Sequence, residues 1–199
     1  MAVNLKSSTS CAMSGCAFTN ASLTLDSLEA TGDVKTRFST PVPYVELKLS
    51  TNVLDINMFM PEEKQAKNGG WLINSAHAAE GWDSTPMDFS ALRGIELVSD
   101  IAAAGVKYDN ITIGKTAMRT KIQRGRLSND IVDAEFYGGK ATIIANLDTA
   151  SGTPVIDKRV TFSNVQMEPL LKALGATDRF SGTGNLQLSV VAQGNNQRD

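Results

Sequence analysis

The sequence predicts a mainly β protein: an extended, twisted antiparallel β-sheet meander with one or two short helices and an open or partly covered groove. Three observations predict this fold class. Apolar and polar residues alternate along most of the chain, as they do where successive strand side chains point to opposite faces. Glycine, aspartate or asparagine turns separate these stretches at intervals of about 8–12 residues. Only residues 167–174 carry a convincing helix pattern.

The first predicted strands lie between residues 18 and 61. Alternation runs over residues 18–38, and we expect Thr31-Gly32-Asp33 to break it as a turn. Pro41-Val42-Pro43 predicts a stiff turn, because proline fixes φ and cannot donate to a central ladder. A strand then carries Val45, Leu47 and Leu49 on one side, and the apolar residues 54–61 are expected to form one helical turn.

The chain beyond residue 61 opens with a break in the pattern. Residues 62–85 are polar and contain glycine and asparagine, which predicts a long connection. Residues 88–94 read as a short helix or turn. Strands then resume, with expected turns at residues 103–105, 109–110, 114–115, 124–125 and 137–139.

The stretch from residue 133 to residue 194 is the most regular part of the chain. It predicts strand, turn, strand, helix, glycine turn and strand, with the helix at residues 167–174 bounded by Pro169 in its first turn and Gly175 at its end. Residues 139–174 repeat the order of residues 32–61: strand, proline turn, strand, and an apolar-acid-apolar terminus. Such a repeat predicts units that share one continuous apolar surface.

The predicted organisation is therefore one continuous sheet in successive parts. These parts are an amino-terminal β unit at 1–61, a long connection at 62–87, a carboxy-terminal β-meander at 88–194 and a polar tail at 195–199. Each alternating strand has one apolar face, which must lie against a helix, another sheet or an apolar ligand. Whether the helix at 167–174 covers this face stays open. The residues predicted to form an apolar groove are Val45, Leu47, Leu49, Ile143, Leu147, Leu186, Leu188 and Val190.

Composition and charge exclude several classes of function. The formal net charge of −2 gives no electrostatic reason to expect a nucleic-acid partner. No apolar run approaches the roughly 20 residues of a membrane helix, and the first residues, MAVNLKSSTSC, contain no secretory signal. Cys11 and Cys16 suit a disulfide across a tight hairpin in an oxidising compartment, with two free thiols as the equal alternative. A metal site is disfavoured and no cofactor is expected, since His77 is the only histidine.

The residues indicate no catalytic site, so we expect a protein that is not an enzyme. His77 stands in a loop of small residues without a GxSxG or Cys–His context. The glycine turns open strands, whereas a phosphate-binding loop must open a helix. The strongest charge feature is interpreted as the solvated face of a half-buried sheet in preference to a site for an anionic partner. Its residues are Arg119, Lys121, Arg124 and Arg126.

Six short motifs in order resemble the AsmA family of bacterial cell-envelope proteins. They are LTLDSLEATGD (23–33), LSTNVLDI (49–56), WDSTPMDFSALR (82–93), AEFYGGKA (134–141), MEPLLKAL (167–174) and RFSGTGNLQL (179–188). The resemblance covers nearly the whole chain and lies in the carboxy-terminal part of that family. It implies a periplasmic segment, tethered to the inner membrane of Gram-negative bacteria by an anchor outside this chain. The cysteine hairpin is not a feature that the resemblance implies.

The resemblance also implies a function in outer-membrane biogenesis. AsmA relatives are similar to bridge-like lipid-transfer proteins, whose curved β-sheets carry phospholipid acyl chains along an apolar groove. We therefore expect a non-catalytic segment that binds or conducts phospholipid or another lipid. The alternative is a structural or assembly factor that binds outer-membrane or other envelope proteins, by strand addition at an exposed sheet edge. A β-fold enzyme is the least favoured interpretation.

Overall fold

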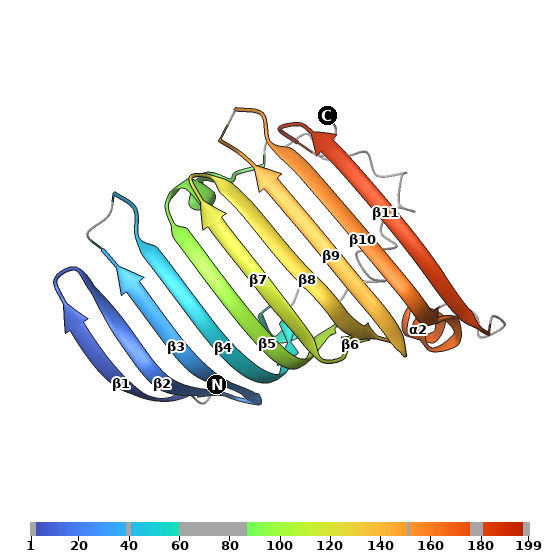
Figure 1. Cartoon of the computed structure of the whole chain (residues 1–199), viewed down its shortest axis with the longest axis horizontal. Coiled ribbons are helices and arrows are strands. Elements are labelled where there is room, and N and C mark those ends of the chain that lie inside the picture. The colour runs from blue at the N-terminus through green and yellow to red at the C-terminus, as the bar shows by residue number, and fades with distance from the viewer. Residues whose placement is uncertain (1–2, 39–40, 60–86, 151, 176–180, 197–199) are drawn as a thin grey trace.

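The computed structural model describes residues 3–38, 41–59, 87–150, 152–175 and 181–196. These residues form one sheet of eleven strands, in the order β1-β2-β3-β4-β5-β7-β8-β9-β10-β11, with β6 beside β5. The strands follow one another in a single layer from the blue amino-terminal strand to the red carboxy-terminal one (Figure 1). The predicted fold class, a mainly β, open and largely antiparallel sheet, is confirmed.

The strands are long, and the described helices are short and lie at strand ends. The strands are β1 (Val3–Ala12), β2 (Gly15–Leu25), β3 (Leu28–Arg37), β4 (Tyr44–Asp55), β5 (Glu96–Tyr108), β6 (Ile111–Ile113), β7 (Thr116–Gln123), β8 (Arg126–Phe136), β9 (Gly139–Asp148), β10 (Val155–Gln166) and β11 (Thr183–Gln193). The helices are the 3-10 turns η1 (Ile56–Phe59) and η3 (Ser90–Arg93) and the α-helix α2 (Met167–Ala173).

One strand pair departs from the predicted antiparallel meander. β4 and β5 pair in parallel, with Tyr44 opposite Glu96 and Asp55 opposite Lys107. Parallel neighbours cannot be joined by a tight hairpin, so the chain must cross from one end of the sheet to the other between them. The predicted long connection at 62–87 falls almost wholly on residues 60–86, which lie outside the described part of the chain.

Two predicted turns are wrong because the strands continue through them. Thr31-Gly32-Asp33 lies inside β3, and the hairpin turn comes earlier, at Asp26-Ser27. Residues 103–105 lie inside β5, which turns only at Asp109-Asn110. In both places small residues mark a close approach of neighbouring backbone instead of a turn. A Cβ at Gly32 would collide with the backbone of Lys48, and one at Gly105 would lie 3.1 Å from the carbonyl oxygen of Ile113.

Gly32 therefore yields a test of this packing. Gly32 has φ +147°, in the region that favours glycine, and its missing side chain leaves room for the β4 backbone. Gly32→Ala should lower the free energy of unfolding by about 2–3 kcal/mol, measured by urea denaturation. Gly94→Ala is the matched control: Gly94 has φ −88° and only one atom near its missing Cβ, at 3.7 Å, so the change should stay within about 0.5 kcal/mol. Equal effects of the two substitutions would contradict this explanation.

Three β-bulges interrupt the ladder at residues with positive φ: Asn20, Asp133 and Asn164. At each bulge the backbone N–H donates to a side chain on a neighbouring strand. Asn20 donates to Asp33 Oδ1 at 3.0 Å, Asp133 to Thr142 Oγ1 at 3.4 Å and Asn164 to Asn185 Oδ1 at 2.9 Å. Because bulges bend a strand and increase its twist, these side chains help to fix the curvature of the sheet.

The main buried cluster lies at one end of the sheet, where α2 and β6 pack against it. It consists of Ile111, Ala134, Phe136, Ala141 and Val165. Leu170 and Leu174, in and after α2, pack on it together with Tyr137. The core of the described chain is thus a local cap over one end of the sheet.

Candidate functional site

The strand register gathers most large aliphatic side chains on one face of the sheet. Residues paired across a ladder point to the same side, so consecutive pairs define rows that cross the strands. One row is Leu49, Ile101, Met118, Ile131, Ile143, Val160 and Leu188. The next row is Phe18, Val34, Leu47, Ser99, Thr120, Asn129, Ala145, Lys158 and Val190. Beyond it lies a row of Val45, Leu97, Ile122, Leu127, Leu147, Ile156 and Ala192. These three rows together make up the apolar face.

All of the predicted groove residues lie on this side of the sheet. Seven are in the three rows, and Leu186 continues the same side beyond Leu188, opposite Phe162. The sequence prediction omitted the middle of the face, including Ile101, Met118 and Ile131. The same alternation that identified the other residues was present there.

The apolar face is only partly buried. Its central residues Leu49, Ile101, Met118, Ile131 and Ile143 are all half-buried. Towards the edge strand β11 exposure increases, to 56% for Leu186, 50% for Leu188 and 43% for Val190. Globular domains normally bury such a face under a second layer of helices or strands. Among the described elements, helices lie only at the ends of the strands.

The short helices lie at the two ends of the strands. α2 follows β10, and its Leu170 packs against the buried cluster around Phe136. At the opposite end, η3 is held to the β7–β8 and β9 ends, where Gly125 N–H donates to the Leu92 oxygen and Arg93 Nη2 donates to the Thr149 oxygen. The helix at 167–174 therefore covers one end of this side and leaves the three rows between the ends without a described helix over them.

The opposite face of the sheet is polar. One row across it carries alternating charges: Asp33, Lys48, Asp100, Arg119 and Asp130. Arg119 Nε lies 2.7 Å from Asp100 Oδ1, and this hydrogen bond raises the pKa of the arginine. These contacts are typical of a solvated surface.

The predicted basic group belongs to this polar face. By the strand register, Lys121 and Arg126 both point to this face, and Arg124 lies in the turn between β7 and β8. Arg126 Nε lies 2.8 Å from Asp148 Oδ2. The backbone N–H of Ala150 and then this arginine lower the pKa of Asp148. In each of these ion pairs a carboxylate offsets the positive charge of the arginine, which favours the interpretation of this group as a solvated face.

A surface depression of about 670 Å³ also lies on the polar face. Its lining includes the small residues Ala102 and Ala117 and the charged residues Lys48, Asp100 and Arg119. Long charged side chains around short ones produce such relief on a solvated sheet. We therefore assign the candidate site to the apolar face.

A polar strip crosses the middle of the apolar face. It consists of Ser99, Thr120, Asn129 and Lys158, all in one row. Ser99 is 3% exposed, and Asn129 Nδ2 donates to Thr120 Oγ1 at 2.7 Å. Burial lowers the pKa of Lys158. Sequence reasoning missed this strip, although Asn129 and Lys158 stand at positions where the alternation calls for apolar residues.

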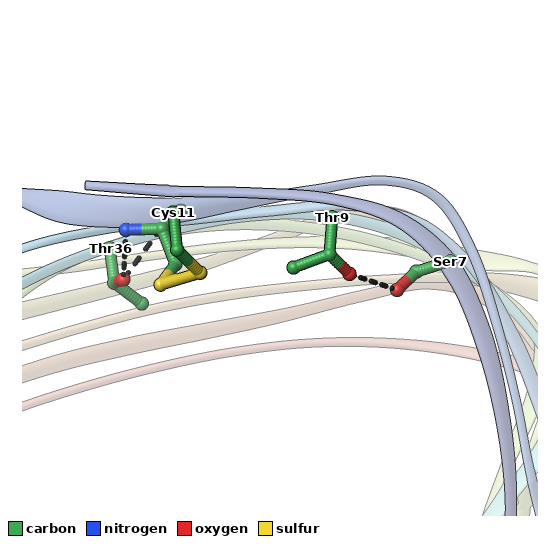
Figure 2. Close-up of a disulfide and its surroundings, with 5 residues drawn as sticks. Ser7, Thr9, Cys11 and Thr36 are labelled. Atoms are coloured by element: carbon green, nitrogen blue, oxygen red, sulfur yellow. Dashed lines mark hydrogen bonds between the residues drawn. A yellow bond between two sulfur atoms is a disulfide. The ribbon is translucent and has the colours of Figure 1, made fainter.

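Cys11 and Cys16 form a disulfide across the first hairpin. They are directly opposite each other on β1 and β2, with Cα atoms 4.1 Å apart. Figure 2 shows Cys11, Thr9 and Thr36 on the same side of the sheet, on the inner side of the bend in the strands. The Cys16 N–H donates to Thr36 Oγ1 at 3.1 Å. Cys11 pairs with Cys16, Cys16 with Thr36, and Thr36 with Val45. The cysteines therefore continue a row of the apolar face towards the β1 edge.

The described residues contain neither a metal-site arrangement nor a membrane-spanning helix. No group of histidine, cysteine, aspartate and glutamate side chains in these residues could hold a metal ion. Within the same ranges, no helix combines the length and the hydropathy required to span a membrane. His77 lies outside the described residues.

Comparison with known proteins identifies a family. A model of the AsmA family matches residues 3–199, which is nearly the whole chain. No curated protein and no solved structure matches the chain.

Proposed function

Because this chain belongs to the AsmA family, a cell-envelope family, we propose that it binds phospholipid acyl chains along its apolar face. In this proposal it is a non-catalytic periplasmic segment of an inner-membrane-anchored protein that acts in outer-membrane biogenesis. The observation that carries the proposal is a single-layer sheet with aliphatic rows on one side, half-buried at the centre. An apolar face of this kind requires a second layer, and hydrocarbon chains would supply it.

The dimensions and energetics of the face support an acyl-chain ligand. The aliphatic rows cross β4, β5 and β7 to β11, which spans about 29 Å at roughly 4.8 Å per strand. Each CH₂ group transferred from water contributes about 0.8 kcal/mol, so ten such groups contribute about 8 kcal/mol. A lipid lying across the strands would therefore gain substantial stabilisation from contact with aliphatic side chains alone.

The disulfide supports the proposed compartment. Disulfides form and persist in oxidising environments such as the bacterial periplasm, and are rare where thiols are kept reduced. The bridge between Cys11 and Cys16 joins an edge strand to its only described neighbour. A periplasmic location is consistent with that bridge.

The proposal is tested by purifying the folded protein without detergent and extracting it for mass spectrometry. We expect phospholipid in a defined molar ratio to protein. A preparation that is folded by circular dichroism, is repeatedly free of lipid and does not take up lipid from vesicles would contradict the proposal.

The sheet edges favour a second candidate function, the binding of envelope proteins by strand addition. β1 and β11 are the two edges, and each pairs on one side only among the described strands. β11, TGNLQLSVVAQ, has no charged residue and no proline, the features that usually protect an edge from further pairing. The test is crosslinking in cells from a residue of β11. Capture of another protein along the outer edge of this strand, by protein that carries no lipid, would favour this function over lipid binding.

A further inference from the structure

β11 is an edge strand without the features by which sheets prevent further pairing. It runs from Thr183 to Gln193 and pairs only with β10 among the described strands. Its register with β10 is regular from Leu186 to Gln193, and it carries neither a charge nor a proline. The backbone N–H and C=O groups on its outer side therefore form a template on which another strand can pair.

The opposite edge of the sheet is protected. β1 carries Lys6, and its register with β2 shifts between Lys6 and Ser8. Lysine side chains and bulges both discourage pairing at an edge. The disulfide between Cys11 and Cys16 also ties β1 to β2. Of the two edges, β11 is therefore the one suited to an added strand.

The aliphatic side chains of β11 lack a neighbour on their outer side. Leu188 on β11 and Val160 on β10 are directly paired in one row of the apolar face. Val160, which has a strand on each side, is 9% exposed, whereas Leu188 is 50% exposed. A strand added to β11 would bury Leu188 as β11 buries Val160, provided that it presents aliphatic side chains on the same face.

A second copy of β11 meets this requirement. When two copies pair antiparallel about a two-fold axis perpendicular to the sheet, their apolar faces lie on the same side. Full overlap of the eleven residues of β11 places this axis at Leu188. Leu188 then lies opposite its own counterpart, and Leu186 lies opposite Val190 of the second copy. On the polar face Gln187 lies opposite Ser189, so no charges repel each other.

We propose that this chain forms a two-fold dimer by antiparallel pairing of β11 with β11 of a second copy. Pairing of β11 with β1 is disfavoured, because each added copy would leave an open edge for further growth, whereas β11 paired with itself closes after two copies. It would also place Ser7 and Thr9, whose hydroxyls bond each other at 3.0 Å, beside the aliphatic side chains of β11. This inference goes beyond the proposed function and does not depend on lipid binding. In the dimer, the two apolar faces form one continuous surface.

The first measurement is the molar mass of the purified full chain by analytical ultracentrifugation. We expect a species of twice the 21.3 kDa of one chain, in an amount that falls on dilution. A chain that stays monomeric up to its highest soluble concentration would overturn the proposal.

Charge substitutions on the polar side of β11 test both the strand and its register. Gln187→Glu combined with Ser189→Glu places carboxylates opposite carboxylates at two symmetric positions. We expect this variant to raise the dissociation constant of the dimer about tenfold, because like charges directly opposite each other destabilise strand pairing. Gln187→Lys combined with Ser189→Glu places an ammonium group opposite each carboxylate and should restore the dimer. Both variants keep the same new carboxylate opposite Arg159 of their own chain.

The matched control is Ser8→Glu combined with Ser10→Glu, which adds the same two charges to the polar side of β1. It should dimerise as the wild type does. Loss of the dimer in this control, or equal dissociation constants for the two β11 variants, would overturn the pairing through β11. Circular dichroism verifies that each variant is folded.

A second test of the register does not depend on those variants. In Leu188→Cys the two new thiols meet at the axis and should crosslink two chains on oxidation. In Val190→Cys the thiols lie four residues apart along the paired strands and should not. No crosslink in the first, or equal crosslinking in both, would overturn the proposed register. Co-purification of phospholipid with a monomeric chain would overturn the dimer and leave acyl-chain binding intact.

Discussion

Replacing Ile143 by glutamate should abolish the co-purification of phospholipid, whereas replacing its neighbour Ile144 by glutamate should leave it unchanged. The two isoleucines are adjacent on β9 but point to opposite faces. Ile143 lies in the central aliphatic row between Ile131 and Val160. Ile144 lies on the polar face. A carboxylate at position 143 would have to be desolvated wherever a hydrocarbon chain covers the row, which is strongly unfavourable.

The comparison controls for composition and for strand propensity, because both variants make the same substitution on the same strand. At position 144 the new carboxylate is opposite Arg159 on β10 and Asp130 on β8, in the solvated row. The measurement is the molar ratio of phospholipid to folded protein by mass spectrometry. Retention of lipid in Ile143→Glu, or equal loss in both variants, would contradict the assignment of the site to the apolar face.

Replacing Phe136 by alanine should destabilise the protein more than Gly32→Ala does. Phe136 is 4% exposed, and its ring lies edge-on to Tyr137, with centroids 4.8 Å apart, and stacked on Phe162, with centroids 5.0 Å apart. It is the largest residue of the cluster under α2. Truncating a buried phenylalanine removes its transfer free energy and leaves a cavity, which together cost about 3–5 kcal/mol.

The matched control is Phe38→Ala, since Phe38 follows β3 and is 58% exposed. We expect that substitution to change stability by about 0.5 kcal/mol or less. Urea denaturation followed by circular dichroism measures both free energies of unfolding. A loss below about 1 kcal/mol in Phe136→Ala would show that the cap formed by α2 does not contribute to global stability.

Much of the fold could be predicted because the alternation of apolar and polar residues shows which face of a β-sheet each side chain lies on. Alternation identified the strands from β7 to β11 with their turns, and the proline and glycine at the ends of residues 167–174 identified α2. Gly32 misled the prediction, because glycine marks both turns and close backbone approaches. The parallel pairing of β4 and β5 was missed for a different reason. Strand direction depends on the path of the connection, which alternation does not encode.

The apolar side of the site was predictable and its polar strip was not. Val45, Leu47 and Leu49 share a face by alternation alone, but register decides which residues of other strands join them. Asn129 and Lys158 are far apart in sequence, and only the pairing of both strands with β9 places them in one row. A single polar residue at an apolar position is weak evidence in one strand. Polar residues at apolar positions become meaningful when several strands place them in the same row.

The parallel pair β4–β5 has a consequence for how this chain folds. Most other neighbouring strands follow each other closely along the chain, so β1–β4 and β5–β11 can each form through more local contacts. Joining them requires Tyr44 to meet Glu96 across a long chain segment, which carries a larger loop-closure entropy. Since non-local contacts slow folding, docking of the two halves should be the late and slow event. Until then β4 and β5 are both open edges, and this is the interval in which the nascent chain is most exposed to misassembly.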